Sequence, residues 1–405
     1  MKRFVFAATA VLTLVVPGAA WAQLFTENFE VDPTADWVMN GGPVDEPGTG
    51  NTDGDNRAFF FFDYSTVGIP KAPNSAPADG TLGMKLQTNI DANNDGISTT
   101  ALVTGMSVSP VGLDLSSAGD YKLTADVWAN FNGPFPAGGS GSTNLATFGI
   151  QTSGTFPNYP GSADGIWFGA TGDGGSTADY RAYSQERVVS YQHPPVTAED
   201  MHATYHAASR NAAATLYADN FGNVTAPQAQ IDLYPNQTGT TQPGAFGMEW
   251  HEVEIAKIGN TVTWKADGVL LITLDTTDIV VAPGGGNILF GHSDINQTAS
   301  LDENRFAMLF TLIDNVKVEE VTAGLTGDHN GDGKVDAADY VLWRSDPASY
   351  GGDPQGYDDW VANFGAMAGS GGGSLAAGGA VPEPGTFAIA LIVLLPMGVV
   401  CRRRA

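Results

Sequence analysis

The sequence contains little cysteine and few basic residues, and each scarcity narrows what the protein can do. Cys401 is the one cysteine among 405 residues, so no intramolecular disulfide forms and stability must come from core burial and from any bound cations. Lys and Arg number 18 against 44 Asp and Glu, a formal net charge of −26. A surface of that sign repels phosphate groups, which argues against nucleic acid and anionic membrane surfaces as partners.

Catalytic and helical signatures are also scarce. The chain has no Gly-x-Ser-x-Gly nucleophile elbow and no glycine loop that would cradle phosphate. One helix-like stretch runs from Thr197 to Leu216, where Thr197 and Asp200 have the spacing of a capping box. His202 and His206 would share a face of that helix, but the glutamate of a His-Glu-x-x-His zinc site is missing. We therefore expect a polar surface insertion here.

Turn-forming residues, in contrast, are plentiful, with 51 Gly and 23 Pro, which favours many short strands. Residues 121–129 alternate apolar and polar side chains with period two. Asp267-Gly268 between two apolar runs predicts a hairpin with a type I′ turn. We expect a mainly β sandwich or jelly roll. Its expected strands are 58–64, 82–87, 100–108, 121–129, 144–152, 250–258, 261–266, 269–274, 287–291 and 308–318.

The first residues have the pattern of a signal peptide. Met1-Lys2-Arg3 precedes an apolar run over residues 4–16, and Ala20-Trp21-Ala22 offers a small-x-small cleavage site before Gln23. We expect residues 1–22 to be a signal peptide and the protein to be exported.

A second apolar run, over residues 387–401, lies between Val381-Pro382-Glu383-Pro384 and Arg402-Arg403-Arg404. About 15 residues are few for a hydrocarbon core of about 30 Å, and the arginines favour the cytoplasmic side. Residues 381–405 resemble the PEP-CTERM sorting signal. The resemblance implies transient anchoring through a C-terminal hydrophobic helix, an exosortase-type sorting enzyme as partner, and a final place at the cell surface or outside the cell. An ordinary membrane anchor is the alternative. Residues 369–380 form a Gly/Ser-rich linker.

Residues 328–339 have the spacing of a twelve-residue Ca²⁺ loop. Oxygen side chains occupy loop positions 1, 3, 5, 9 and 12, Gly333 at position 6 makes the sharp turn, and a backbone carbonyl serves position 7. We predict one Ca²⁺ bound by the Asp328, Asn330, Asp332, Asp336 and Asp339 side chains and the Lys334 carbonyl.

The residues after this loop resemble a dockerin repeat. Position 12 is Asp339 instead of an EF-hand glutamate, and Tyr340-x-x-Trp343 follows it. The pair recurs as Tyr357-x-x-Trp360, but the preceding Gly352-Asp353-Pro354-Gln355 lacks an Asp-x-Asn-x-Asp run. We expect a dockerin-like, α-helical, Ca²⁺-binding unit over residues 322–368 with a degenerate second repeat. The resemblance implies a cohesin-like partner.

Residues 23–321 are long enough for one large core. Three segments resemble the concanavalin A-like (laminin-G-like) lectin/glucanase sandwich: Glu27-Asn28-Phe29-Glu30, residues 250–268 and residues 312–318. The resemblance implies a jelly-roll fold and carbohydrate binding. These segments are architectural motifs, not catalytic ones, so they support the fold more than a function.

Glucanases of this fold carry a Glu-x-Asp-x-x-Glu pattern on one strand. Here Glu252 and Glu254 share a strand face at a different spacing, and we expect a solvent-facing row opposite Val253 and Ile255. The sequence therefore favours a non-catalytic protein.

Two other sets of residues are weaker candidates. The acidic loops Asp53–Asp55 and Asp91–Asp95 have part of the Ca²⁺ pattern, with a plain turn as the default. Five aromatic residues could stack on sugar rings, with core burial as the alternative for most: Trp167, Phe168, Tyr180, Tyr183 and Tyr191.

Three functional classes remain. The expected one is an exported, non-catalytic cell-surface or matrix protein with a glycan- or matrix-binding sandwich and a Ca²⁺-dependent docking unit. A glycoside hydrolase or lyase acting on extracellular polysaccharide is the first alternative, and a purely structural surface component is the second.

Overall fold

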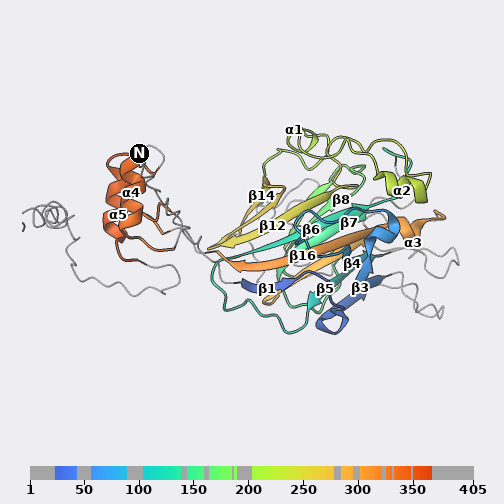
Figure 1. Cartoon of the computed structure of the whole chain (residues 1–405), viewed down its shortest axis with the longest axis horizontal. Coiled ribbons are helices and arrows are strands. Elements are labelled where there is room, and N and C mark those ends of the chain that lie inside the picture. Colours follow the sequence, from blue (N-terminus) through green and yellow to red (C-terminus); the bar gives the residue numbers. More distant parts are fainter. Residues whose placement is uncertain are drawn as a thin grey trace, which may run out of the picture. The chain divides into compact units, whose positions relative to one another are not determined.

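The structure is a computed structural model. It describes residues 23–42, 56–88, 104–137, 144–158, 164–184, 187–188, 203–277, 284–294, 302–321, 325–330, 333–347 and 350–366. The chain divides into two compact units between Val321 and Thr322. The larger unit holds the strands and the smaller one holds two helices (Figure 1).

The larger unit is a sandwich of two antiparallel sheets (Figure 1). Sheet A has nine described strands. Their spatial order is β11 (Ala203–Tyr205), β14 (Val269–Asp275), β13 (Thr261–Ala266), β12 (Trp250–Ile258), β6 (Tyr121–Asn130), β16 (Phe310–Glu320), β4 (Leu82–Gln87) and β3 (Arg57–Asp63), with β1 (Gln23–Glu27) also paired to β16.

Sheet B has seven described strands. Their order is β10 (Arg187–Val188), β9 (Tyr180–Ser184), β8 (Ile166–Thr171), β7 (Asn144–Thr152), β15 (Asn287–Asp294), β5 (Thr104–Pro110) and β2 (Trp37–Gly42). The predicted mainly β, two-sheet sandwich is therefore confirmed.

The core lies between the sheets and follows from strand alternation. On β6, Leu123, Ala125 and Val127 point inward and are buried, as the period-two pattern predicts. Trp264 from sheet A packs on Phe148 from sheet B, with ring centroids 5.1 Å apart. Each such large side chain contributes about 1.5–3 kcal/mol when fully buried.

Short helices and loops cover part of the outer face of sheet A. Besides α1 (Thr215–Ala218), α2 (Gln228–Leu233) and α3 (Arg305–Met308), there are two 3₁₀ turns, η1 (Thr34–Asp36) and η2 (Tyr64–Val67). Tyr64 and Ile69 join a second buried cluster with Trp128 and Leu312, which face outward from β6 and β16. Residues 64–72 therefore pack on the outside of sheet A.

The helix predicted over residues 197–216 is wrong where the structure describes it. Residues 203–205 form strand β11, which pairs with β14 at an edge of sheet A, and only Thr215–Ala218 are helical. Without β11, strand β14 would present a row of unpaired backbone N–H and C=O groups at the edge of the sheet. Pairing of residues 203–205 with that edge is more favourable than the helix that the local pattern predicts. Residues 197–202 lie outside the described residues.

The smaller unit consists of α4 (Ala337–Ser345), α5 (Gln355–Asn363) and their loops. The two helices contact through the repeated Tyr and Trp side chains, with Tyr340 and Trp360 rings 5.0 Å apart and Trp343 and Tyr357 rings 5.2 Å apart. Each Trp indole also donates a hydrogen bond to the other repeat: Trp360 Nε1 to the Asp336 carbonyl at 2.7 Å and Trp343 Nε1 to the Gly352 carbonyl at 3.1 Å. The repeat seen in the sequence is therefore also a structural repeat.

Within the described part of the chain, every helix is too short or too polar to cross a lipid bilayer. Residues 387–401, the expected hydrophobic helix, lie outside that part.

Candidate functional site

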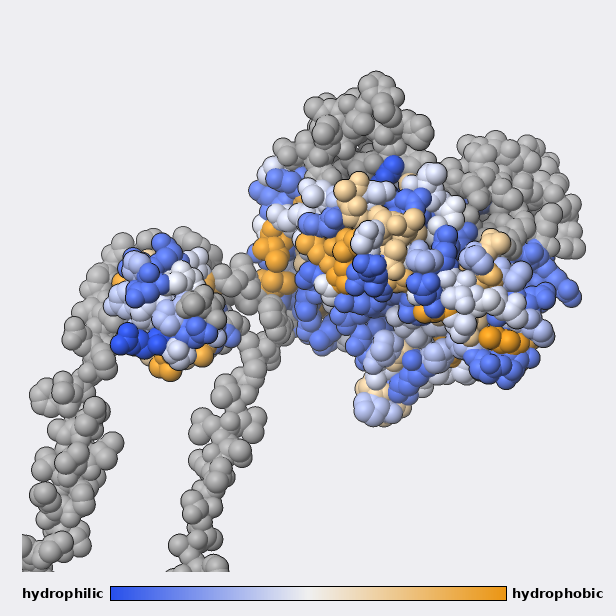
Figure 2. Space-filling model, turned by 90° about the horizontal axis from the view of Figure 1, so that it is seen from above, coloured by the Kyte–Doolittle hydropathy of each residue, from blue (hydrophilic) through white to orange (hydrophobic). Residues whose placement is uncertain are grey.

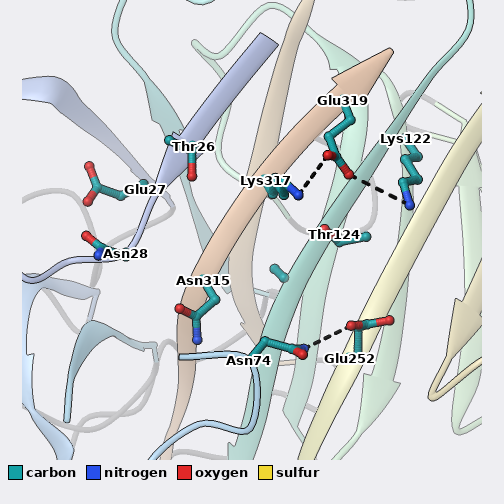
Figure 3. A pocket seen from close by; sticks show the side chains of 11 residues that line it. Thr26, Glu27, Asn28, Asn74, Lys122, Thr124, Glu252, Asn315, Lys317 and Glu319 are labelled. Atoms are coloured by element: carbon teal, nitrogen blue, oxygen red, sulfur yellow. Dashed lines mark hydrogen bonds and ion pairs between the residues drawn. The ribbon is translucent and has the colours of Figure 1, made fainter. Parts of the chain in front are cut away.

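The outer face of sheet A carries a polar cavity of about 390 Å³ (Figure 3). Its walls come from β1 and the residue after it, from the loop that contains Asn74, and from strands β6, β12 and β16. The lining residues are Thr26, Glu27, Asn28, Asn74, Lys122, Thr124, Ala125, Glu252, Asn315, Lys317 and Glu319. Ammonium, carboxylate, amide and hydroxyl groups predominate, which suits a ligand rich in hydroxyl groups.

Strand register brings three carboxyl groups into one row beside this cavity. Asp126 on β6 is the Cα partner of Glu252 on β12 and of Asp314 on β16. All three side chains leave the same face of the sheet because directly opposed residues do so. Of the three, only Glu252 lines the cavity.

A β-bulge adds an amide to the row. Two residues of β16, Asn315 and Val316, stand opposite Ala125 alone, and Asn315 has a positive φ of 51°. Val316 stays in the core, and the Asn315 side chain donates to Asp126 Oδ2 at 2.8 Å. Without the bulge, strand alternation would turn a residue at this position inward.

Asn74 covers the row from the loop. Its side-chain amide donates to Glu252 Oε2 at 2.9 Å (Figure 3). The same amide donates to Asp126 Oδ1 at 2.7 Å, and the backbone N–H of Asn74 donates to Asp126 Oδ2 at 3.1 Å. Asp126 is 0% exposed. It is therefore a fully hydrogen-bonded anchor for the loop, not a group that meets the ligand.

Burial makes the two inner carboxyls weak acids. Burial raises the pKa of Asp314 to about 7, and repulsion from Asp126 and Glu30 adds to the shift, against hydrogen bonds from Asn315 N–H and the Tyr64 hydroxyl. Burial also raises the pKa of Asp126, against hydrogen bonds from Asn315 and Asn74. Near neutral pH, Asp314 therefore holds its proton far more readily than an exposed aspartate does.

The other end of the cavity carries positive charge. Glu319 Oε1 lies 2.7 Å from Lys317 Nζ, and Glu319 Oε2 lies 3.8 Å from Lys122 Nζ (Figure 3). The two ammonium groups share one carboxylate. The cavity thus has a cationic end and an acidic end on one sheet face.

The expected solvent-facing row on β12 is present. Glu252 is exposed, whereas Val253 and Ile255 are 1% and 0% exposed in the core. Glu254 pairs with Lys265 at 2.8 Å. Sequence reasoning placed Glu252 and Glu254 on a shared face and expected no catalysis by them, but it named none of their partners.

The loop before α4 turns at Gly333. The Gly333 N–H donates to Asp328 Oδ2 at 2.8 Å, and Gly333 has a positive φ of 81°. Asp336 is the N-cap of α4 and forms a capping box with Asp339. Asn330 and the Lys334 carbonyl belong to this same loop, whereas Asp332 lies outside the described residues.

Asp339 already accepts three backbone hydrogen bonds. His329 N–H and Asn330 N–H donate to its Oδ1 at 2.8 and 3.0 Å, and Asp336 N–H donates to Oδ2 at 2.7 Å. A carboxylate offers about four lone-pair directions, so Asp339 has room for one metal contact. Among the residues that the structure describes, no group of three or more His, Cys, Asp and Glu side chains could hold a metal.

The second loop closes through its backbone. Gly352 N–H donates to the Pro347 carbonyl at 2.8 Å, and Gly356 N–H donates to the Gly352 carbonyl at 2.9 Å. Gly351 and Gly352 both have positive φ, which permits this path.

The weaker candidates lie elsewhere. Trp167, Phe168, Tyr180 and Tyr183 are each 0% exposed, so they are core residues. His206 Nε2 lies 3.0 Å from the Thr273 hydroxyl on β14. The acidic loops Asp53–Asp55 and Asp91–Asp95, together with Tyr191 and His202, fall outside the described residues.

Comparisons with known proteins give distant likenesses. No protein-family model matches the chain, and no curated protein does either. Solved structures similar to it include an endo-1,3-β-glucanase from Streptomyces sioyaensis (13% identity, TM-score 0.34, 76% of this chain and 98% of that one). A protein with a galectin-like fold from Bacillus subtilis is 8% identical (TM-score 0.35, 74% and 98%). A legume lectin-like domain from Entamoeba histolytica is also 8% identical (TM-score 0.33, 75% and 100%). The two-sheet sandwich itself rests on the strand pairing described above.

Proposed function

We propose that this protein is exported to the cell surface or extracellular matrix, where its concanavalin A-like sandwich binds carbohydrate without cleaving it. The polar cavity on sheet A supports the proposal, because amide, hydroxyl and charged side chains from four strands and a loop converge there. We favour binding over cleavage because each carboxylate that lines the cavity already has a partner: Glu319 contacts Lys317 and Lys122, Glu252 accepts from Asn74, and Glu27 accepts from the Phe29 N–H.

Filling the cavity floor tests the binding site. Thr124 lies in the middle of the floor on β6, and Thr124→Trp would fill the space without changing any charge. Thr263→Trp is the matched control, because Thr263 is a half-buried residue of the neighbouring strand β13 and does not line the cavity. We expect Thr124→Trp to weaken polysaccharide binding at least tenfold and Thr263→Trp to leave it unchanged.

The assay is a panel of soluble polysaccharides, followed by calorimetry for binding and by reducing-end release for cleavage. Binding without release supports the proposal. Release of reducing ends would instead support the hydrolase or lyase alternative, and absence of any binding would support a purely structural role.

We further propose that the unit over residues 322–368 is dockerin-like and binds one Ca²⁺ through Asp328, Asn330, Asp332, Asp336, Asp339 and the Lys334 carbonyl. The bond from Gly333 to Asp328 and the turn at Gly333 support it. Four of the five side chains are carboxylates, so a bound cation relieves their repulsion and stabilises the loop. Its partner would resemble a cohesin.

Calcium titration of the full mature chain tests this site. One equivalent of Ca²⁺ should bind, and Asp328→Ala should abolish that binding, whereas Asp358→Ala, which removes an exposed carboxylate from α5, should not. Two equal sites, or no binding at millimolar Ca²⁺, would contradict the proposal.

Export and sorting remain part of the same proposal. The intact mass of the native protein should show a chain that starts at Gln23 and lacks the segment after Pro384. Retention of both terminal segments would contradict it.

A further inference from the structure

The two ends of the cavity differ in charge, and strand register sets their separation. Lys122 and Glu319 are Cα partners, and so are Asp126 and Glu252. Four residues of β6 separate Lys122 from Asp126, which corresponds to about 14 Å at about 3.4 Å per residue. Lys317 stands opposite Thr124, halfway between them and about 7 Å from the Asp126 and Glu252 pair. A ligand that reaches from Lys122 to Glu252 spans more than one sugar ring and must be an oligosaccharide.

Lys317, at the cationic end, has donor capacity beyond its ion pair with Glu319. Lys317 carries three N–H donors and a side chain that is 44% exposed, and it contacts Glu319 at 2.7 Å. Lys122 adds a second positive charge beside the same carboxylate at 3.8 Å. With Glu319 between them, the two lysines leave one net positive charge at this end, in a chain whose formal net charge is −26. Glu27 also lines the cavity and is the Cα partner of Val316, the residue before Lys317.

The acidic end has acceptor capacity. Glu252 is exposed and accepts one hydrogen bond, from Asn74 at 2.9 Å. An ionised carboxylate is purely an acceptor with about four lone-pair directions. It would repel an anionic group and accept hydrogen bonds from sugar hydroxyls.

We propose that the cavity selects an acidic oligosaccharide, whose anionic group binds at Lys317 and Lys122 while hydroxyl groups of a neighbouring sugar donate to Glu252. This proposal rests on the carbohydrate-binding function proposed above and deepens it by naming the ligand class. The anion is a uronate carboxylate or a sulfate ester, because both accept charge-assisted hydrogen bonds from ammonium groups.

Three oligosaccharides distinguish the possibilities: an oligoglucuronate, sulfated maltohexaose and unmodified maltohexaose. We expect one or both acidic probes to bind the full chain at least tenfold more tightly than the neutral one in calorimetric titrations at 50 mM NaCl. The affinity for the acidic probe should fall several-fold at 300 mM NaCl, because salt screens exposed charges. The comparison of the two acidic probes identifies which anion the cavity prefers.

Charge variants assign the effect to the cavity. Lys317→Gln should weaken binding of the acidic probe about tenfold and weaken binding of the neutral probe much less. Lys257→Gln removes the same charge from β12 outside the cavity, where Lys257 contacts the Gly119 carbonyl at 3.3 Å, and should change neither.

Glu319→Gln should change the affinity for the acidic probe in the opposite direction. It removes the internal competitor for both lysines, so it should tighten binding of the acidic probe, whereas a variant that merely damaged the fold would weaken all binding. Equal affinity for neutral and acidic probes, or an unchanged affinity in Lys317→Gln, would overturn the ligand class and leave carbohydrate binding intact. Failure of all three probes to bind would overturn both.

Discussion

Replacement of Asp314 by Asn should stabilise the sandwich more at pH 8 than at pH 5. Asp314 is 2% exposed, and burial raises the pKa of its carboxyl to about 7 from an ordinary value of 3.8. A shift of that size corresponds to about 4 kcal/mol, at about 1.36 kcal/mol per pH unit. Coupling to the neighbouring Asp126 spreads the effect over two groups, so we expect about 2–4 kcal/mol.

The sign follows from proton binding. Because its pKa is raised in the folded state, Asp314 binds more protons in the folded protein than in the unfolded one between about pH 4 and pH 7. Its contribution to stability is complete below about pH 4 and is lost as the pH rises through about 7. An Asn side chain keeps an acceptor for the Asn315 N–H, which donates to Asp314 Oδ1 at 2.7 Å, and carries no charge at any pH.

Urea unfolding monitored by tryptophan fluorescence at pH 5 and pH 8 measures the effect. Part of the contribution is already lost at pH 5, so the free energy of unfolding of Asp314→Asn relative to the parent should be about 1–3 kcal/mol higher at pH 8 than at pH 5. Asp36→Asn, at an exposed carboxyl of the same unit, is the control and should show no such change. An equal difference at both pH values would refute the reasoning.

Two further predictions concern other buried groups. Burial and the nearby Arg57 lower the pKa of Lys85 to about 8 from 10.5, so the unfolded state binds more protons between those values and the stability of the parent should rise from pH 8 to pH 10.5. Lys85→Met should lack this pH dependence. Its free energy of unfolding relative to the parent, measured by urea unfolding, should therefore be about 2–3 kcal/mol higher at pH 7 than at pH 10.5. The same difference at both pH values would contradict the prediction. Gly244→Ala should destabilise by about 3 kcal/mol or more in the same assay, because Gly244 has a φ of +80° and an added Cβ would lie 2.0 Å from the Ala212 carbonyl oxygen. Gly112→Ala, with a φ of +77° and open space around the added Cβ, should cost only about 1–2 kcal/mol, and equal costs would show that the close approach to Ala212 has no effect.

The outer face of sheet A indicates how the sandwich can hold such an unfavourable group. The face of the larger unit that is seen from above is mostly hydrophilic, with hydrophobic patches among the polar side chains (Figure 2). The buried carboxyls Asp126 and Asp314 are instead satisfied by amide and hydroxyl donors from the 64–75 segment and from the bulge in β16. Unfavourable buried charge beside a cavity is typical of functional sites.

The sequence by itself determined the features that depend on neighbours along the chain. The Asp267-Gly268 turn formed as predicted, with φ values of +50° and +78°, because these residues tolerate a left-handed backbone. Strands β4, β7, β12 and β13 have the predicted bounds, since each alternates with period two or is bounded by turn residues. Helix α4 begins at Ala337, after an N-cap that is visible in the sequence.

Only the tertiary structure decided the features that depend on pairing across the sheets. Strands β8 and β9 were missed because they are buried on both faces and do not alternate, and β11 is a strand only because β14 has a free edge. The cavity unites Asn74, Lys122, Glu252 and Lys317, which are far apart in the sequence and meet through strand register and one bulge. Local alternation predicts which face of each strand is buried, but the strand order and the bulge that turns Asn315 outward are set by pairing across the sheet.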